Sequence, residues 1–208
     1  MLWLVGLRQA VAQFSFASAV NYTVGSYPVS VTTADVNRDG KLDLICACFS
    51  TNQVWIMTGN GNGGLSLSSK VNVGNGPTCV TSADLNGDGN VDIITANLWD
   101  NTLSVLRNNG SGFFTLNSTL AVGSHPRSVV AADVNGDGKM DLICANNGSS
   151  TLSVLTNDGS GGFVLSSSPS VGLVTVHRVN RNVREEWVSV SEEGIRKNPT
   201  TEKEWGAH

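Results

Sequence analysis

The chain has 208 residues, a formal net charge of −4 and a sequence pI near 5.3. This acidic balance excludes a generally basic surface, so we expect no nucleic-acid partner. Glycine is abundant, at 23 residues, and Glu is absent before Glu185, which together favour short strands and turns over helices. No segment is long and apolar enough to span a bilayer as a helix, and we expect no membrane insertion.

Residues 1–13 form an apolar N-terminal segment that Arg8 interrupts. With the small residues at 17–19 this segment weakly resembles a secretion signal. Residues 14–25, however, already match the repeat described next. We therefore leave 1–13 unassigned and expect a strand from Phe14 to Val24, equivalent to the last strand of a preceding repeat.

A unit of 49 residues repeats between residues 14 and 172. The motif D-x-N-x-D-G-x-x-D begins at Asp35, Asp84 and Asp133, in two steps of 49 residues. A fixed period of this size indicates a solenoid or a propeller. The same step separates the glycines of the Val-Gly pairs and the prolines that follow them, which are Gly25, Gly74, Gly123 and Gly172, and Pro28, Pro77 and Pro126.

Four short strands are predicted in each unit. In the third copy they cover residues 127–132, 140–145, 151–156 and 163–171, with β-branched residues in the runs and Gly, Ser and Asn clusters between them. The second strand is apolar on both faces, which is typical of a strand between two neighbouring layers. Four strands in 40–50 residues form one propeller blade. The sequence therefore predicts an all-β fold, a partial β-propeller of three four-stranded antiparallel blades at about 26–74, 75–123 and 124–172, within a repeat region of 14–176.

The nine-residue motif places oxygen-bearing side chains at positions 1, 3, 5 and 9, and Gly at position 6. Ca²⁺ takes six to eight oxygen ligands at about 2.3–2.6 Å, and a tight loop supplies them from alternate residues. Gly permits the positive φ that such a turn requires. Three carboxylates in one empty loop repel one another, which favours a bound cation or partial protonation. The candidate ligands are Asp35, Asn37, Asp39, Lys41 and Asp43; Asp84, Asn86, Asp88, Asn90 and Asp92; and Asp133, Asn135, Asp137, Lys139 and Asp141, with Lys41, Asn90 and Lys139 acting through the backbone carbonyl.

The motif differs from an EF-hand at position 12. An EF-hand has a bidentate Glu there and a helix on each side. This chain has Cys46, Thr95 or Cys144 at that position. The four cysteines show no metal-binding spacing, and we expect buried free thiols on strands.

The 49-residue unit resembles the FG-GAP (VCBS-type) repeat, known from the propeller of integrin α subunits and from many bacterial surface and secreted proteins. The resemblance depends on D-x-N-x-D-G-x-x-D, on the V-G-x-x-P joints and on the G-x-F/L turn exits, over about residues 14–172. It implies Asp loops that bind Ca²⁺ on one face of a ring of roughly seven blades. It also implies an adhesion or ligand-binding role and an extracellular, cell-surface or periplasmic location.

The chain departs from the family pattern in two respects. Three blades do not close a ring of the usual size, so we expect further blades from a parent chain, or self-association. The repeat also stops near residue 177: Asn182 stands where a fourth Asp loop is due, and residues 177–208 mix six Lys or Arg with six Glu. We expect this charged tail to be disordered.

No pairing of a nucleophile with a base is visible, and His125, His177 and His208 have no partner in the sequence pattern. We therefore expect a calcium-binding, non-enzymatic module for adhesion or for binding a protein or glycan. The alternative is a lectin-like propeller, or an accessory domain of a carbohydrate-active enzyme. Aromatic residues at equivalent positions of every blade would favour that alternative, but Trp55 and Trp99 occupy different columns of the repeat.

Overall fold

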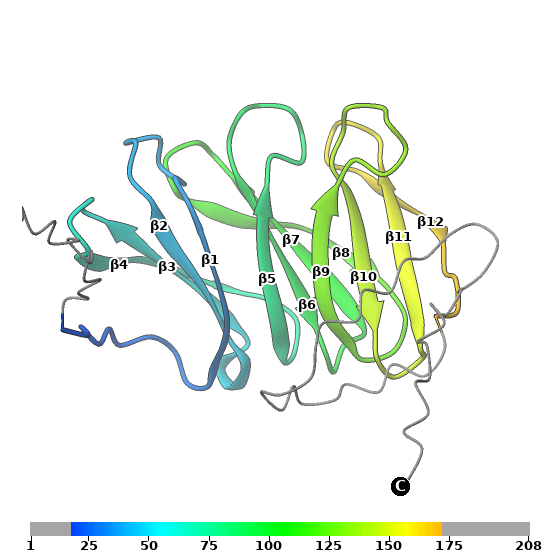
Figure 1. The fold of residues 1–208 in the computed structure, drawn as a ribbon, viewed down its shortest axis with the longest axis horizontal. Coiled ribbons are helices and arrows are strands. Elements are labelled where there is room, and N and C mark those ends of the chain that lie inside the picture. The colour runs from blue at the N-terminus through cyan, green and yellow to red at the C-terminus, as the bar shows by residue number, and fades with distance from the viewer. Residues whose placement is uncertain (1–17, 172–208) are drawn as a thin grey trace, which may run out of the picture. The chain divides into compact units, whose positions relative to one another are not determined.

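The computed structural model describes residues 18–171 (Figure 1). The chain divides into two units, residues 1–174 and 175–208, and all described residues belong to the first. The expected N-terminal segment 1–13 and the expected disordered tail 177–208 lie outside the described residues. Within 18–171, no helix is long and apolar enough to cross a membrane.

Twelve strands form three four-stranded antiparallel sheets, each built from four strands that are consecutive in sequence. This confirms the predicted all-β fold with four-stranded blades. The first sheet contains β1 (Pro28–Ala34), β2 (Asp43–Cys48), β3 (Gln53–Gly59) and β4 (Leu65–Asn72). The second contains β5 (Pro77–Ala83), β6 (Asp92–Asn97), β7 (Thr102–Asn108) and β8 (Phe114–Ala121). The third contains β9 (Pro126–Ala132), β10 (Asp141–Asn146), β11 (Thr151–Asn157) and β12 (Phe163–Ser167). A short 3-10 turn, η1 (Phe49–Thr51), follows β2.

Two of the expected strands differ from the structure. Strand β12 ends at Ser167 rather than near residue 171, because Pro169 has no N–H to donate to the ladder; pairing resumes only as an isolated bridge between Thr151 and Ser170. Residues 18–24, the described part of the strand expected at 14–24, are not in a strand. The Tyr22 hydroxyl in this segment donates a hydrogen bond to the Gly63 carbonyl, at 2.7 Å.

Two hydrophobic clusters lie between successive sheets. Every residue of β6 is buried, as predicted for a strand with apolar side chains on both faces, because β6 has a sheet on each side. The cluster between the first and second sheets contains Val36, Ile45, Ala47, Val54, Ile56, Val80, Ile93, Leu106 and Phe114. The cluster between the second and third contains Leu85, Ile94, Ala96, Leu103, Val105, Val129, Leu142, Cys144 and Leu155.

Among residues 18–171, no further sheet packs on the outermost faces of the first and third sheets. Val36 and Leu85, at position 2 of the first and middle Asp loops, are 1% and 2% exposed, because the next sheet packs on each of them. The equivalent Val134 is 51% exposed. At the other end, Val31 of β1 is exposed, whereas its counterparts Val80 and Val129 are buried. Each end of the described repeat therefore leaves exposed an apolar position that is buried wherever two of the sheets meet: Val31 at one end and Val134 at the other.

Candidate metal centre

Each predicted Asp loop joins the first and second strands of a sheet, and the three loops are drawn at the top of Figure 1. The glycines at position 6, Gly40, Gly89 and Gly138, have φ of 78°, 78° and 83°. This confirms the requirement for positive φ there. Position 4 is also left-handed, at Arg38 (φ 62°) and at its glycine counterparts. A non-glycine residue is strained in this region, so the first loop carries a small local cost that the other two avoid.

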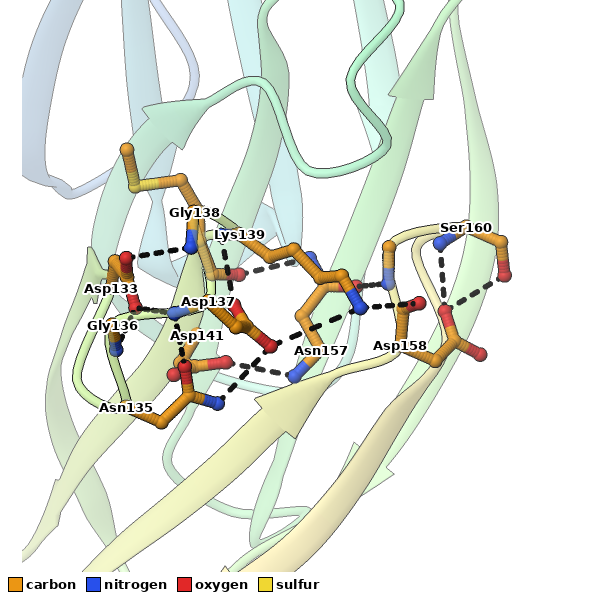
Figure 2. Close-up of polar contacts among 12 residues, drawn as sticks. Asp133, Asn135, Gly136, Asp137, Gly138, Lys139, Asp141, Asn157, Asp158 and Ser160 are labelled. Carbon is orange, nitrogen blue, oxygen red and sulfur yellow. Dashed lines mark hydrogen bonds and ion pairs between the residues drawn. The ribbon is translucent and has the colours of Figure 1, made fainter.

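Carboxylates at positions 1 and 5 shape the loop by accepting bonds from its own amides. In the third loop, shown in Figure 2, Asp133 Oδ1 accepts from the Gly136 N–H (2.7 Å), and its Oδ2 accepts from the Gly138 N–H (2.8 Å). Asp137 Oδ1 accepts from the Lys139 N–H, at 2.9 Å. These bonds turn the side-chain oxygens toward the inside of the loop rather than away from it.

Asparagine at position 3 takes part in the same network. In the third loop, Asn135 Oδ1 accepts from the Asp137 N–H, at 2.9 Å, and Asn135 Nδ2 donates to Asp137 Oδ2, at 3.3 Å. The middle loop repeats both bonds between Asn86 and Asp88, at 3.1 and 2.9 Å. The structure thus brings together the side chains predicted at positions 1, 3 and 5.

The carboxylate at position 9 has a different environment from the other loop oxygens. Asp43, Asp92 and Asp141 are buried. In the middle loop, Asp92 Oδ1 accepts from the Asn108 N–H (2.9 Å) at the end of β7, and Oδ2 accepts from the Leu85 N–H (3.3 Å) at loop position 2. The other two copies make the same pair of bonds. This side chain therefore ties the loop to the third strand of its own sheet, and only its remaining lone pairs are free for a cation.

Sequence reasoning missed two residues that hold the loops from the neighbouring sheet. Asn108 Nδ2 donates to the carbonyl of Val36 in the first loop, at 2.8 Å, and to the Val91 carbonyl, at 3.1 Å. Asn157 makes the equivalent bond to the Leu85 carbonyl of the middle loop, at 2.7 Å. The 49-residue spacing of the two asparagines was an available signal, although Gly59 occupies that column in the first copy.

Electrostatics in the loops follow from these contacts. The Asn90 amide beside Asp88 and the Gly138 amide beside Asp133 hold the pKa of both carboxyls below the usual range. Burial raises the pKa of Asp92, opposed by the amides of Asn108 and Leu85. Asp88 and Asp133 therefore stay charged more readily than Asp92.

Lysine at position 7 places an ammonium group beside these oxygens in two of the loops. The Lys41 Nζ atom lies 3.6 Å from Asp39 Oδ2, and the Lys139 Nζ atom lies 3.8 Å from Asp137 Oδ2. The middle loop has Asn90 instead, and its Oδ1 atom is buried without a hydrogen-bond partner among the described residues. An ammonium group at this distance partly neutralises the loop and competes with a cation for the same carboxylate.

The donors in each loop fit a hard cation by their chemistry. They are carboxylate oxygens at positions 1 and 5, an amide oxygen at position 3, and the position 7 carbonyl, all of which suit Ca²⁺. Within residues 18–171, however, no group of three or more His, Cys, Asp or Glu side chains is already gathered as a metal site. The position 9 carboxylate is buried, and each of its oxygens already accepts a backbone N–H bond. A cation in the loop would depend on two carboxylates, with neutral oxygens and water completing its shell.

A row of aromatic side chains lies at the opposite ends of the strands from the Asp loops. Tyr27, Phe49, Trp99 and His125 form a continuous row, with successive ring centroids 5.7, 6.4 and 5.9 Å apart. The row crosses all three sheets and borders a groove of about 620 Å³. Trp55 lies elsewhere, beneath the Lys70 ammonium, which is 4.1 Å from its ring. The sequence pattern concealed this row, because only Tyr27 and His125 share a column of the repeat, whereas Phe49 and Trp99 each occupy a different one.

Comparison with solved structures shows the same fold at low sequence identity. A functionally unknown protein from Desulfotomaculum acetoxidans matches with a TM-score of 0.57 and 19% identity, over 70% of this chain and 43% of that one. A periplasmic gluconolactonase from Pseudomonas aeruginosa matches with a TM-score of 0.56 and 22% identity, over 74% and 42%. The chain thus spans less than half the length of these structures. A search of curated proteins finds no match.

The model of the FG-GAP-like repeat matches the sequence three times, at residues 35–95, 84–144 and 133–180. Each match begins at the first Asp of a loop and ends beyond the next loop or the last strand. The matches together cover well over half of the chain and confirm the resemblance based on the loop motif and the joints. The chain belongs to the FG-GAP-like repeat family.

Proposed function

We propose that the chain is a calcium-binding, non-enzymatic repeat module of a secreted or surface protein, which serves adhesion or ligand binding. The observation that carries the proposal is the shape of the Asp loops. Three times, side-chain oxygens at positions 1, 3 and 5 are turned into a loop closed by a left-handed glycine. Calcium would hold the loop in this shape and offset the repulsion between its carboxylates.

Thermal unfolding with and without calcium tests this proposal. A ligand that binds only the folded state at about 100 times its dissociation constant adds about 2.7 kcal/mol per site. For a domain of this size, 1 kcal/mol corresponds to about 2–4 °C in Tm. We expect millimolar Ca²⁺ to raise Tm by at least about 5 °C relative to excess chelator. Mg²⁺ should substitute poorly, because it requires a tighter octahedral shell.

The variant Asp88→Ala locates the effect in the middle loop. It also removes the bond from the Asn90 N–H, at 2.7 Å, so its Tm falls even in chelator. The informative quantity is therefore the calcium-dependent increment, which should shrink by about the contribution of one site. Asp100→Ala, a carboxylate in the β6–β7 turn at the other strand ends, is the matched control and should keep the full increment. Equal increments in both variants, or none in the wild type, would contradict calcium binding at these loops.

The uncovered apolar columns at the two ends of the repeat support a partner of the same architecture. Val31 on the first sheet and Val134 on the third occupy columns that are buried wherever two sheets meet. We propose that another blade packs on each end, supplied by a longer parent chain or by a second copy bound head to tail.

Complementing variants test the head-to-tail form. Val31→Glu blocks one end, and Val134→Glu blocks the other. Each variant alone should be monomeric by light scattering, whereas the mixture should associate through its two intact faces. Val20→Glu, at an exposed position outside the sheets, is the control. A wild-type chain that is monomeric up to about 100 μM would leave only the parent-chain form, since self-association of useful strength lies below that concentration.

A further inference from the structure

We propose that the groove beside the aromatic row binds an acidic oligosaccharide, with a uronic-acid carboxylate on Arg127 and a sugar face on Trp99. This second site lies away from the Asp loops. It gives the proposed binding module a ligand class, and it rests on that proposal only in assuming that the module binds a ligand.

The first support is the exposure of the aromatic rings. Trp99 is 60% exposed, although it packs edge-on against Phe49 and against His125. The groove is lined by the rings of Tyr27, Phe49 and Trp99 together with short aliphatic side chains. A pyranose ring has one face of C–H groups, whose positive edges are attracted to the negative face of an aromatic ring. The rings are held by one another, so little side-chain order has to be gained on binding.

The second support is the unpaired charge of Arg127. This side chain lines the groove on β9 and is exposed. Within residues 18–171, the arginine side chains that donate hydrogen bonds are Arg38 and Arg107, and the ion pairs are those of Lys41 and Lys139, so the Arg127 guanidinium takes part in neither. The carboxylate of Asp100, which follows Trp99 in the chain, accepts bonds from the Asn75 N–H and Nδ2 atoms, each at 2.7 Å. A free guanidinium beside apolar rings favours a ligand that combines an apolar face with a carboxylate.

The backbone around the groove favours a sugar over an extended peptide. A peptide that adds to a sheet needs free amides and carbonyls along an edge. Here the turn amides are already used: Phe49 N–H donates to the Tyr27 carbonyl at 2.9 Å, and Trp99 N–H donates to the Asn75 carbonyl at 3.1 Å. The polar side chains that line the groove include Arg127 and the hydroxyl groups of Ser50 and Thr78. The Thr78 hydroxyl already donates to the carbonyls of Ala96 and Pro126, at 3.2 and 3.1 Å, so toward a ligand it can serve only as an acceptor. Hydroxyl groups and a guanidinium can hydrogen-bond to the hydroxyl groups and the carboxylate at the rim of an acidic sugar.

The site is independent of the cation loops in position. Its residues lie where β1 begins and where β2 and β6 end, whereas the Asp loops lie at the opposite ends of the same strands (Figure 1). The two proposals therefore have separate readouts. Calcium binding is measured by the calcium-dependent shift in Tm, and groove binding is measured by titration with the sugar.

The test is calorimetric titration of the full chain with tri-galacturonate and with its methyl ester, in millimolar calcium and again in chelator. We expect saturable binding of the acid form. Trp99→Ala should weaken binding of the acid about tenfold or more, because an aromatic platform is lost. Arg127→Gln should weaken binding of the acid form by a similar factor and leave binding of the methyl ester unchanged.

Two variants at the other ends of the strands serve as matched controls. Phe113→Ala removes an aromatic ring that is 67% exposed. Arg107→Gln removes one positive charge that acts on Asp88 and Asp92 of the middle Asp loop. Both should bind the acid as the wild type does, and circular dichroism should confirm that all four variants are folded.

Several results would overturn the inference. They are the absence of saturable binding at about 10 mM sugar, equal weakening by the control variants, and binding that survives both groove variants but disappears with chelator. The last result would place the sugar on loop-bound calcium. A Glu-rich peptide that binds more tightly than the sugar, with the same dependence on Trp99 and Arg127, would assign the groove to a peptide instead.

Discussion

Replacing Asn108 with Ala should uncouple the first Asp loop from the second sheet. The Asn108 side chain is buried, and its Nδ2 atom donates to the carbonyls of Val36 and Val91. Its Oδ1 atom accepts from the N–H groups of Gly110 and Gly112, at 3.0 and 3.2 Å. One side chain thus makes four bonds that bridge two sheets and close the β7–β8 turn.

The cost follows from the groups left without partners. The Val36 carbonyl is the critical one, because the Val36 side chain lies in the apolar cluster between the two sheets. A buried polar group that loses its partner costs about 1–3 kcal/mol. The Gly112 amide is also buried, whereas the bonds to the Gly110 amide and the Val91 carbonyl are only partly buried, so we count two full losses. Two losses at this cost give about 2–6 kcal/mol of unfolding free energy. We expect about 2–4 kcal/mol, because single substitutions rarely cost more than about 4–5 kcal/mol.

Urea unfolding at pH 7 measures this loss. With an m-value of about 2 kcal/mol/M, the midpoint should fall by about 1–2 M. Asn108→Asp should be worse than Ala, because a carboxylate would face the two carbonyls that the amide now satisfies. Asn109→Ala is the control, since Asn109 is exposed and its side chain bonds only within the turn.

The reasoning fails if Asn108→Ala and Asn109→Ala have the same midpoint, or if Asp at 108 is tolerated better than Ala. Either result would mean that the cross-sheet bond contributes nothing and that packing alone holds the loop. A change in the m-value without a change in midpoint would also contradict it, because the altered quantity would then be the surface exposed on unfolding.

Three further predictions concern the metal loops, a close backbone contact and the thiols. Lys139→Met should raise calcium affinity by about two- to fivefold in isothermal titration, since an exposed ion pair is worth about 0.2–1 kcal/mol; an unchanged or weaker affinity would show that the ammonium does not compete. Gly59→Ala should lower Tm more than Gly87→Ala does. A Cβ atom at position 59 would collide with the Leu42 carbonyl oxygen, whereas a Cβ atom at position 87 would meet open space and only the positive φ would be strained. Equal losses in Tm would show that the contact with Leu42 is not the cause. Burial raises the pKa of Cys144 to about 12 from 9.0. Between these two pH values the thiol ionises only in the unfolded chain, so the free energy of unfolding is unaffected below pH 9 and falls by about 1.4 kcal/mol per pH unit from pH 9 to pH 12. Unfolding measured at alkaline pH should show this slope, and Cys144→Ala should reduce it.

The sequence alone was enough to determine the repeat and its internal strands. The 49-residue period, the turn glycines and the alternation within each run are local features, because each depends on residues a few positions apart. The predicted end of β12 was wrong, and the reason is also local. Pro169 occupies the position that Leu120 has in the second copy, and proline has no N–H to donate to the strand ladder. The left-handed glycine at loop position 6 was equally predictable, because the backbone turn itself demands it.

Only the tertiary structure separated residues that look equivalent in sequence. Asp88 and Asp92 are both carboxylates of one motif, yet the first is exposed in the loop and the second is buried, bonded to the end of β7. Asn108 contacts Val36 across 72 residues, a separation that no local pattern encodes. The aromatic row was hidden for the same reason: Phe49 and Trp99 belong to different columns of the repeat and meet only because one sheet packs beside the next. Spacing along the chain determines what a strand or loop becomes, whereas packing between sheets decides which of its side chains reach water, a neighbour or a ligand.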